Sequence, residues 1–304
     1  MPSSKSAVLS TLMRMAIKPS FAAIKNVDDL RSGGVKFFDR VSPLERGMTV
    51  EKAPLTHCEA DWVYPDKIKT DRVVLYVPGG AFVLRTPGLH RALAGRIAKS
   101  AHARALVVFY RLAPEHPFPA ALEDCIEAYE RLLADGVAPS RIIVGGDSAG
   151  GNLTLALLFE LRDRGRPLPA GAFALSPVTD LRPHLRGSRT TNQQADPMLS
   201  SLYKSRLDFH GLYVAGKTKL FDDPRVSPVL GDFSGLPPMM FQVGSTEILL
   251  DDSCLAVEQA RRAGASAAVE VWADMPHVWH GWNLPESKRA ISHISDFIRQ
   301  HCPS

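Results

Sequence analysis

The sequence predicts an α/β protein in which a mostly parallel, doubly wound central sheet is flanked by helices and carries a helical cap. Short apolar runs typical of buried strands alternate with longer helical segments from about residue 56 onward. This alternation favours a parallel sheet, because each helix returns the chain across one face of the sheet before the next strand. A chain of 304 residues is long enough to bury such a core as one domain with insertions.

Residues 1–55 are expected to form an N-terminal arm that is helical and irregular, without a strand, and is part of the cap. The first 21 residues have an apolar phase that Lys5, Arg14 and Lys18 interrupt. Because no uncharged apolar core precedes a small-residue cleavage site, the pattern indicates an amphipathic helix and not a signal peptide. We therefore expect a cytoplasmic protein, with a membrane-surface helix as the alternative.

The main domain is expected to span residues 56–304, and its strands are short apolar runs that break on turn-forming residues. One such strand ends on Pro78, Gly79 and Gly80. In chain order the expected strands are Leu55–Val63, Arg72–Val77, Ala105–Tyr110, Ile142–Val144, Gly171–Ser176, Met239–Val243 and Ala268–Trp272.

Helices are expected between these strands, and helix-end signals support two of them. Pro119–Ala134 has proline at its start and Gly136 just past its end, and Gly264 closes Cys254–Ala263. The other expected helices are Leu89–Ser100, Asn152–Leu161 and Glu286–His301.

Residues 181–221 interrupt the alternation of strands and helices. The segment is long and polar and has no strand pattern, although it lies between two expected sheet strands. A long insert at the C-terminal ends of sheet strands is more often a lid than a linker. We expect this insert to form the cap together with the N-terminal arm.

Composition and charge argue against several classes of protein. The formal net charge is +4 and no basic run is interleaved with aromatic residues, so nucleic acid is not an expected partner. No stretch approaches the roughly 18 apolar residues of a membrane span, so integral membrane association is not expected. The cysteines lie far apart, which favours free thiols in a reducing cytoplasm: Cys58, Cys125, Cys254 and Cys302.

The stretch Arg141–Gly151, which reads RIIVGGDSAGG, carries the strongest functional signal. An apolar strand runs directly into a helix, with the G-x-S-x-G pentapeptide 146–150 between them. Such a turn strains the residue at its apex and brings strand and helix so close that the flanking positions need glycine. The apex residue, Ser148, is then exposed as a nucleophile. A capping serine in a Gly-rich turn is the alternative interpretation.

A nucleophilic serine needs a histidine to take its proton and a carboxylate to orient that histidine. In α/β-hydrolases the chain order is serine, acid, histidine. His277 and His280 directly follow the strand Ala268–Trp272, whereas the other histidines after Ser148 fall in the insert or the last helix. We expect His277 to be the base, with His280 as the alternative. No metal site is expected, because the pair lacks a motif such as H-E-x-x-H.

The acid is expected in the loop after the strand Met239–Val243, where Glu247, Asp251 and Asp252 are candidates. Glu247 is nearest to the end of the strand, where a carboxylate can reach a histidine on the neighbouring loop. The two aspartates are also explained as favourable charges at the N-terminus of the next helix.

An oxyanion hole needs backbone N–H groups that point at the developing negative oxygen of the substrate. Ala149 follows the nucleophile and supplies one of them. The others are expected from a Gly-rich turn after an early strand, and Val77–Phe82 is in that place. A simple Pro-Gly turn is the alternative.

Together these blocks resemble the hormone-sensitive-lipase-like carboxylesterases, the bacterial family IV esterases of the α/β-hydrolase fold. Residues 146–151 match the family signature GDSAGG, and residues 110–120 look like its YRLAPEHPFPA block. The similarity extends through Ser227–Pro228 and Leu236–Pro238 and covers the chain from about Asp71 to the C-terminus. The combination of blocks is highly specific.

Carried over to this sequence, the resemblance implies a catalytic triad of Ser148, Glu247 and His277. The implied donors of the oxyanion hole are the N–H groups of Gly80, Ala81 and Ala149.

Three positions depart from the family pattern. Pro78 replaces the histidine of the H-G-G-G motif, so the hydrogen bonds of that histidine are lost. Ala81 replaces the third glycine, where a positive φ costs about 1–2 kcal/mol. Glu247 stands where the D-P-L-x-D motif has aspartate, which leaves Asp251 as a rival.

The expected function is that of a serine carboxylesterase that hydrolyses short-chain acyl esters through an acyl-enzyme. The expected partner is a small-molecule ester, and no metal or organic cofactor is expected. The alternatives are a catalytically silent, receptor-like binding protein, which the presence of His277 argues against, and an acyltransferase or amidase with the same triad. The resemblance alone implies a possible homodimer through the last strand. The expected wall of the substrate pocket includes Phe82 and Trp279, whereas Phe209 and Tyr213 line it or pack inside the cap.

Overall fold

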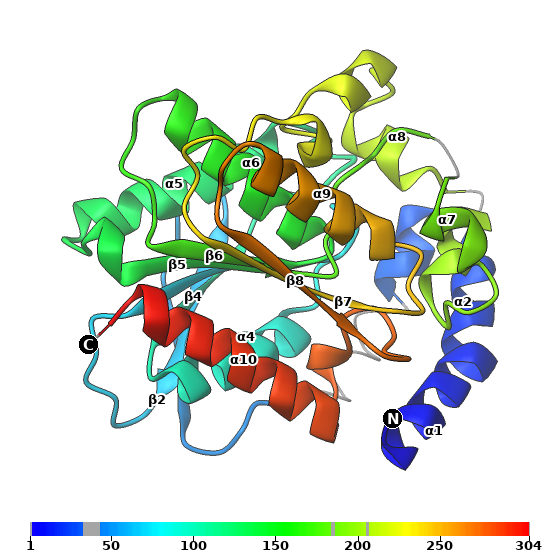
Figure 1. Cartoon of the computed structure of the whole chain (residues 1–304), viewed down its shortest axis with the longest axis horizontal. Coiled ribbons are helices and arrows are strands. Elements are labelled where there is room, and N and C mark those ends of the chain that lie inside the picture. The colour runs from blue at the N-terminus through cyan, green and yellow to red at the C-terminus, as the bar shows by residue number, and fades with distance from the viewer. Residues whose placement is uncertain (1, 33–42, 184–185, 205–206, 304) are drawn as a thin grey trace.

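A computed structural model describes residues 2–32, 43–183, 186–204 and 207–303 and has an eight-stranded sheet at its centre (Figure 1). The strands are β1 (Met48–Lys52), β2 (Glu59–Pro65), β3 (Val73–Val77), β4 (Arg104–Phe109), β5 (Ile142–Asp147), β6 (Gly171–Leu175), β7 (Met239–Gly244) and β8 (Ala267–Trp272). Their order across the sheet is β1-β2-β4-β3-β5-β6-β7-β8. β2 pairs antiparallel with β1 and β4, and every pairing from β4 to β8 is parallel. This arrangement confirms the predicted fold class.

Both faces of the sheet are covered by helices. On one face lie α4 (Pro87–Ala101) and α10 (Pro285–His301), and on the other lie α5 (Ala120–Ala134), α6 (Ala149–Asp163) and α9 (Leu250–Arg262) (Figure 1). Successive side chains of β3 enter different core clusters: Val74 and Tyr76 pack with α4 and α10, while Leu75 and Val77 pack with α5 and α6. Burial on both faces explains why the strand is a continuous apolar run.

Strand β1 corrects the expectation that the arm contains no strand. The strand has only two apolar residues, Met48 and Val50, and its last three residues are exposed. It pairs with β2 at the edge of the sheet. Because such an edge strand buries little apolar surface, it lacks the hydrophobic pattern by which buried strands are predicted. β2 also begins at Glu59, four residues later than expected.

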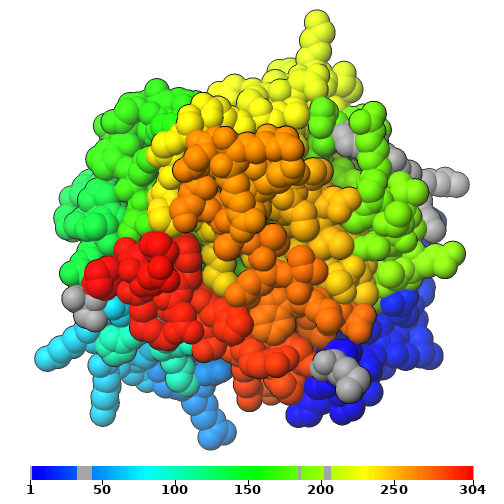
Figure 2. All heavy atoms as spheres, in the orientation of Figure 1, coloured from blue at the N-terminus to red at the C-terminus, as the bar shows by residue number. Residues whose placement is uncertain are grey.

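The arm and the insert lie side by side at the C-terminal ends of the parallel strands. The arm forms a nearly continuous helix from α1 (Ser4–Leu12) through a π-helical turn (Met13–Ile17) to α2 (Lys18–Ala22). The insert contains short helices, among them α7 (Ser188–Thr191), a 3₁₀ segment (Leu199–Lys204) and α8 (Phe209–Tyr213). In Figure 2 the blue atoms of the arm lie directly below the yellow-green atoms of the insert. Within the described ranges, no helix is both long and apolar enough to cross a membrane.

Candidate active site

Ser148 occupies a strained turn between β5 and α6. Its backbone angles, φ 54° and ψ −118°, lie in a region that residues with a side chain rarely adopt. A Cβ atom added to Gly146 would lie 2.4 Å from the carbonyl oxygen of Val77, and one added to Gly150 would lie 1.9 Å from the same atom. The close approach of β3 therefore requires both glycines, and the turn exposes the serine at the end of the sheet.

The structure brings His277 and Glu247 together. The distance from His277 Nδ1 to Glu247 Oε2 is 2.7 Å, and the two residues are 4% and 0% exposed. The other carboxylate oxygen, Oε1, accepts hydrogen bonds from Ser176 Oγ at 2.7 Å and from the backbone N–H of Gly244 at 2.6 Å. Both oxygens thus have fixed partners, and only Oε2 faces the histidine.

The other two candidate acids have different partners. Asp251 accepts a hydrogen bond from the backbone N–H of Ser188, at 2.8 Å. Asp252 is buried in an ion pair with Arg189 at 2.7 Å. Burial raises the pKa of this carboxyl group despite the neighbouring guanidinium. Neither carboxylate contacts a histidine among the described residues, so Glu247 alone of the three candidates meets the histidine.

Ser148 and His277 both line a cavity beneath the cap. In the described part of the chain, no hydrogen bond joins the two side chains directly. Catalytic hydrogen bonds of this kind are often long without substrate and shorten in the complex. The cavity wall therefore contains a hydroxyl and an imidazole, and this imidazole is bonded to a buried carboxylate.

His280, the alternative base, lies elsewhere. It is fully buried, its Nε2 is 2.9 Å from Gln242 Oε1, and it is not part of the cavity wall. Burial lowers the pKa of His280 to about 3, so the imidazole is neutral near pH 7. We interpret His280 as a core residue.

Beside Ser148, the turn after β3 has an unusual backbone. Gly80, Ala81 and Phe82 have φ values of 128°, 51° and 64°. The carbonyl oxygen of Gly80 accepts hydrogen bonds from the N–H groups of Val83 and Leu84, at 3.0 and 2.8 Å. None of the hydrogen bonds found among the described residues uses the N–H of Gly80 or Ala81. The N–H of Ala149 is likewise without an acceptor inside its helix, because this residue is the first of α6.

The expected loss of hydrogen bonds at Pro78 is offset by a buried network around Asp147. Oδ1 of Asp147 accepts hydrogen bonds from the Tyr76 hydroxyl at 2.7 Å and the Gly79 N–H at 3.1 Å, and His90 Nε2 lies 3.5 Å away. Burial raises the pKa of Asp147, but His90, Tyr76 and Gly79 outweigh it and hold that pKa below its ordinary value. His90 comes from α4, and sequence reasoning missed it because its spacing from Asp147 gives no local signal.

The turn is braced from outside by the segment that resembles the YRLAPEHPFPA block. The Tyr110 hydroxyl donates to the carbonyl oxygen of Pro78 at 2.9 Å, and the N–H of Ala113 donates to that of Phe82 at 2.9 Å. Arg31 of the arm donates to the carbonyl of Ala113 and forms an ion pair with Glu115. This block is therefore structural support for the turn.

The cavity wall is mostly apolar and comes from three parts of the chain. The arm contributes Phe21 and Leu30, and the insert contributes Met198, Leu199 and Phe209. The main domain contributes Leu84, Leu89, Val278 and Trp282. An apolar wall around a few polar groups is typical of sites for small organic ligands.

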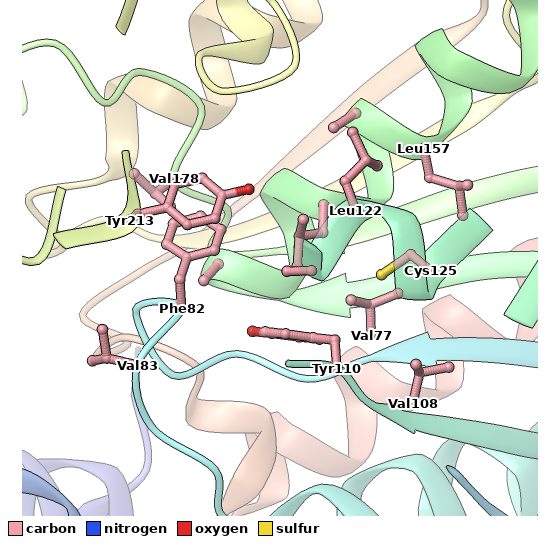
Figure 3. Packing of buried hydrophobic residues seen from close by; sticks show 14 of the residues in the cluster. Val77, Phe82, Val83, Val108, Tyr110, Leu122, Cys125, Leu157, Val178 and Tyr213 are labelled. Carbon is pink, nitrogen blue, oxygen red and sulfur yellow. The ribbon is translucent and has the colours of Figure 1, made fainter. Parts of the chain in front are cut away.

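The structure corrects the expectation that Phe82 and Trp279 line this wall. Phe82 is 2% exposed and stacks on Tyr213, with ring centroids 3.7 Å apart (Figure 3), so its ring packs inside the core and is not part of the cavity wall. Trp279 is fully buried against Trp272, and Trp282, three residues later, faces the cavity instead.

Among the residues that the structure describes, no group of three or more His, Cys, Asp or Glu side chains is arranged to hold a metal ion.

The chain is similar to known hydrolases and esterases in sequence and in fold. The family profile described as alpha/beta hydrolase fold matches residues 74–281. An acetyl-hydrolase of Streptomyces hygroscopicus is 42% identical over 248 residues, which are 80% of each chain. A crystal structure of an esterase from the bacterial hormone-sensitive lipase family superposes with a TM-score of 0.90 at 39% identity and covers 99% of both chains. An esterase soaked with p-nitrophenyl butyrate superposes with a TM-score of 0.90 at 35% identity, over 99% of this chain and 100% of that one.

Proposed function

We propose that this chain cleaves short acyl esters with Ser148 as its nucleophile. The chain belongs to the hormone-sensitive-lipase-like branch of the alpha/beta hydrolase fold family and is a carboxylic ester hydrolase. The observation that carries the proposal is the 2.7 Å contact between His277 Nδ1 and Glu247 Oε2, at the edge of a cavity that Ser148 and His277 share. A carboxylate on Nδ1 keeps the proton on that nitrogen and leaves Nε2 free to accept another.

In the first half of the reaction, Ser148 Oγ attacks the ester carbonyl while its proton passes to His277 Nε2. The new imidazolium is stabilised by the carboxylate of Glu247. The carbonyl oxygen becomes an oxyanion, which the N–H groups of Gly80, Ala81 and Ala149 stabilise. Each such donor is worth about a hundred- to a thousandfold in rate when it is already in place.

In the second half, His277 returns its proton to the alkoxide, and the alcohol leaves as the bond from carbon to the alcohol oxygen breaks. The acyl group remains as an ester on Ser148. Water then attacks this acyl-enzyme with His277 again as the base, and the carboxylic acid and the free serine are formed.

The apolar wall of the cavity and the similarity to known short-chain ester hydrolases support short acyl chains as substrates. Phe209, Met198 and Leu199 line the cavity on the side of the insert. Phe21 lines it on the side of the arm. We propose that these residues contact the substrate in place of Phe82 and Trp279. The similarity to an acetyl-hydrolase and to an esterase soaked with a butyrate ester supports the same size class.

The proposal is tested by hydrolysis of p-nitrophenyl esters from acetate to palmitate. We expect activity to be highest for the short chains and to be lost in Ser148→Ala and His277→Ala, while Asp251→Asn keeps it. A fully active Ser148→Ala protein would refute the mechanism.

The alternative functions are distinguished by this assay and two extensions of it, an added alcohol acceptor and anilide substrates. A receptor-like protein would bind esters without releasing nitrophenol. An acyltransferase would make more transfer product than acid when an alcohol acceptor is added, and an amidase would cleave the matching anilides at a comparable rate.

A further inference from the structure

The loop that carries Glu247 is held from outside by the cap insert. Nδ2 of Asn192 donates two hydrogen bonds, to the carbonyl oxygen of Ser245 at 3.0 Å and to that of Glu247 at 2.8 Å. These two acceptors lie on either side of Thr246, so the amide fixes the backbone at and just before the acid. Asn192 follows the short helix α7 and belongs to the insert.

A second insert residue, Asp196, holds the next peptide group. Asp196 is fully buried, and its Oδ2 accepts a hydrogen bond from the N–H of Ile248 at 3.0 Å. Its Oδ1 accepts bonds from the N–H groups of Met198 and Leu199, at 2.7 and 2.6 Å. Because Met198 and Leu199 line the cavity, one carboxylate joins the loop of the acid to the cavity wall.

The turn 192–196 is itself anchored. The N–H of Asp196 donates to the carbonyl oxygen of Asn192 at 2.8 Å, which closes the turn. From the arm, Arg14 donates to the carbonyl oxygens of Gln194 and Ala195, at 2.7 and 2.6 Å, and Lys18 donates to that of Asp196 at 2.8 Å. The turn is therefore bonded to the arm on one side and to the acid loop on the other.

From these contacts we infer that Asn192 and Asp196 are positioning residues for the catalytic acid, so that the cap fixes the triad as well as covering the substrate. The inference rests on the proposed role of Glu247. The side chain of Glu247 is oriented by Ser176, Gly244 and His277. Its backbone carbonyl and the N–H of Ile248, the next residue, are instead bonded to the two insert residues. A displacement of about 1 Å in a catalytic group can cost about a hundredfold in rate.

The first test replaces Asn192 by aspartate. This change keeps the shape of the side chain but replaces the NH2 group, which donates two hydrogen bonds, by an oxygen that faces the same two carbonyl oxygens. We expect kcat for p-nitrophenyl acetate to fall about tenfold to a hundredfold with KM within about twofold, because the two carbonyl groups that Asn192 holds belong to the acid loop and not to residues of the cavity wall. The matched control is Gln193→Glu, the same exchange one residue later. Among the described residues, this amide donates to the carbonyl of Arg189 and not to the acid loop. We expect Gln193→Glu to keep wild-type kcat.

A double-mutant cycle separates positioning from general damage. If Asn192 acts through Glu247, Asn192→Asp lowers the rate by less than about twofold once Glu247 is glutamine, because the function that it supports is already lost. Full additivity of the two losses, or an Asn192→Asp protein with wild-type kcat, would overturn the inference. Glu247→Gln with wild-type activity would instead overturn the proposed function. If Asn192→Asp does not fold, Asn192→Ala with Gln193→Ala as control gives the same cycle without a new charge.

Discussion

Replacing Glu247 by glutamine tests the triad with the smallest change in shape. The orientation of the new amide is fixed by its neighbours, since Ser176 Oγ and the Gly244 N–H both donate to the position of Oε1. The amide oxygen must take that position, and its NH2 group then faces His277 Nδ1 at about the present 2.7 Å. Nδ1 must become an acceptor, which moves the imidazole proton to Nε2, the nitrogen that has to receive the proton of Ser148.

The expected loss in kcat is about 10⁴-fold, the size of effect seen when a triad acid becomes an amide and the histidine is held in the wrong tautomer. At about 1.36 kcal/mol for each tenfold change, this is about 5 kcal/mol of transition-state stabilisation. KM is expected to stay within a few fold, because Glu247 is fully buried and is not part of the cavity wall.

The assay is steady-state hydrolysis of p-nitrophenyl acetate with purified Glu247→Gln, and thermal unfolding serves as a check on folding. Asp251→Asn is the matched control, since this neighbouring carboxylate bonds to the N–H of Ser188 and not to a histidine. A folded Glu247→Gln protein with kcat within tenfold of wild type would refute the argument from tautomers. If Asp251→Asn were the inactive variant, Asp251 would be the acid and our assignment would be wrong.

Three further predictions concern the cavity, the elbow and acid stability. Phe209→Ala removes a side chain from the cavity wall and should shift the preferred ester from acetate towards hexanoate. Tyr213→Ala is the control, because Tyr213 is not part of the wall, and it should leave the preference unchanged. An unchanged chain-length profile in Phe209→Ala would contradict the assignment of Phe209 to the wall. Gly150→Ala places a methyl carbon 1.9 Å from the carbonyl oxygen of Val77, so we expect urea unfolding to show a loss of about 3 kcal/mol or more, or no folded protein. The pKa of His280 is about 3 in the folded protein and about 6.5 in the unfolded chain, so its contribution to stability is complete above pH 6.5 and is lost as the pH falls towards 3. Between pH 6 and 4 the unfolding free energy of wild type should therefore fall by up to about 1.4 kcal/mol per pH unit more than that of His280→Gln, and equal slopes would contradict this.

The parts of this protein that the sequence predicts are those whose physical cause is local. β5, the strained Ser148 and the flanking glycines are adjacent in the chain, and the close approach that requires the glycines follows from the strand-to-helix turn itself. The parallel pairing from β4 to β8 follows from the alternation of strand and helix. Glu247 and His277 were predicted because each follows a strand end, and neighbouring parallel strands end at the same edge of the sheet.

The features that the sequence does not predict depend on contacts between distant residues. Ser176 and His90 lie 71 and 57 positions away in sequence from the carboxylates of Glu247 and Asp147, and neither belongs to a recognisable motif. Trp279 and Trp282 are three residues apart, and only the 3₁₀ turn that begins at Trp279 decides which of them faces the cavity. Such choices depend on packing, which periodicity alone does not contain.

The departures at Pro78 and Ala81 show how the oxyanion turn keeps its shape without the full glycine motif. Ala81 adopts a φ of 51° at a cost of about 1–2 kcal/mol, and the turn must offset this cost. Gly80 is required in this turn, because a Cβ atom there would lie 2.1 Å from the carbonyl oxygen of Leu84. Asp147 then takes over the role of anchoring the turn, through the N–H of Gly79 and with His90 beside it. Since Asp147 also precedes Ser148 directly, the same residue fixes the oxyanion turn relative to the nucleophile, and the missing motif histidine is not needed for that purpose.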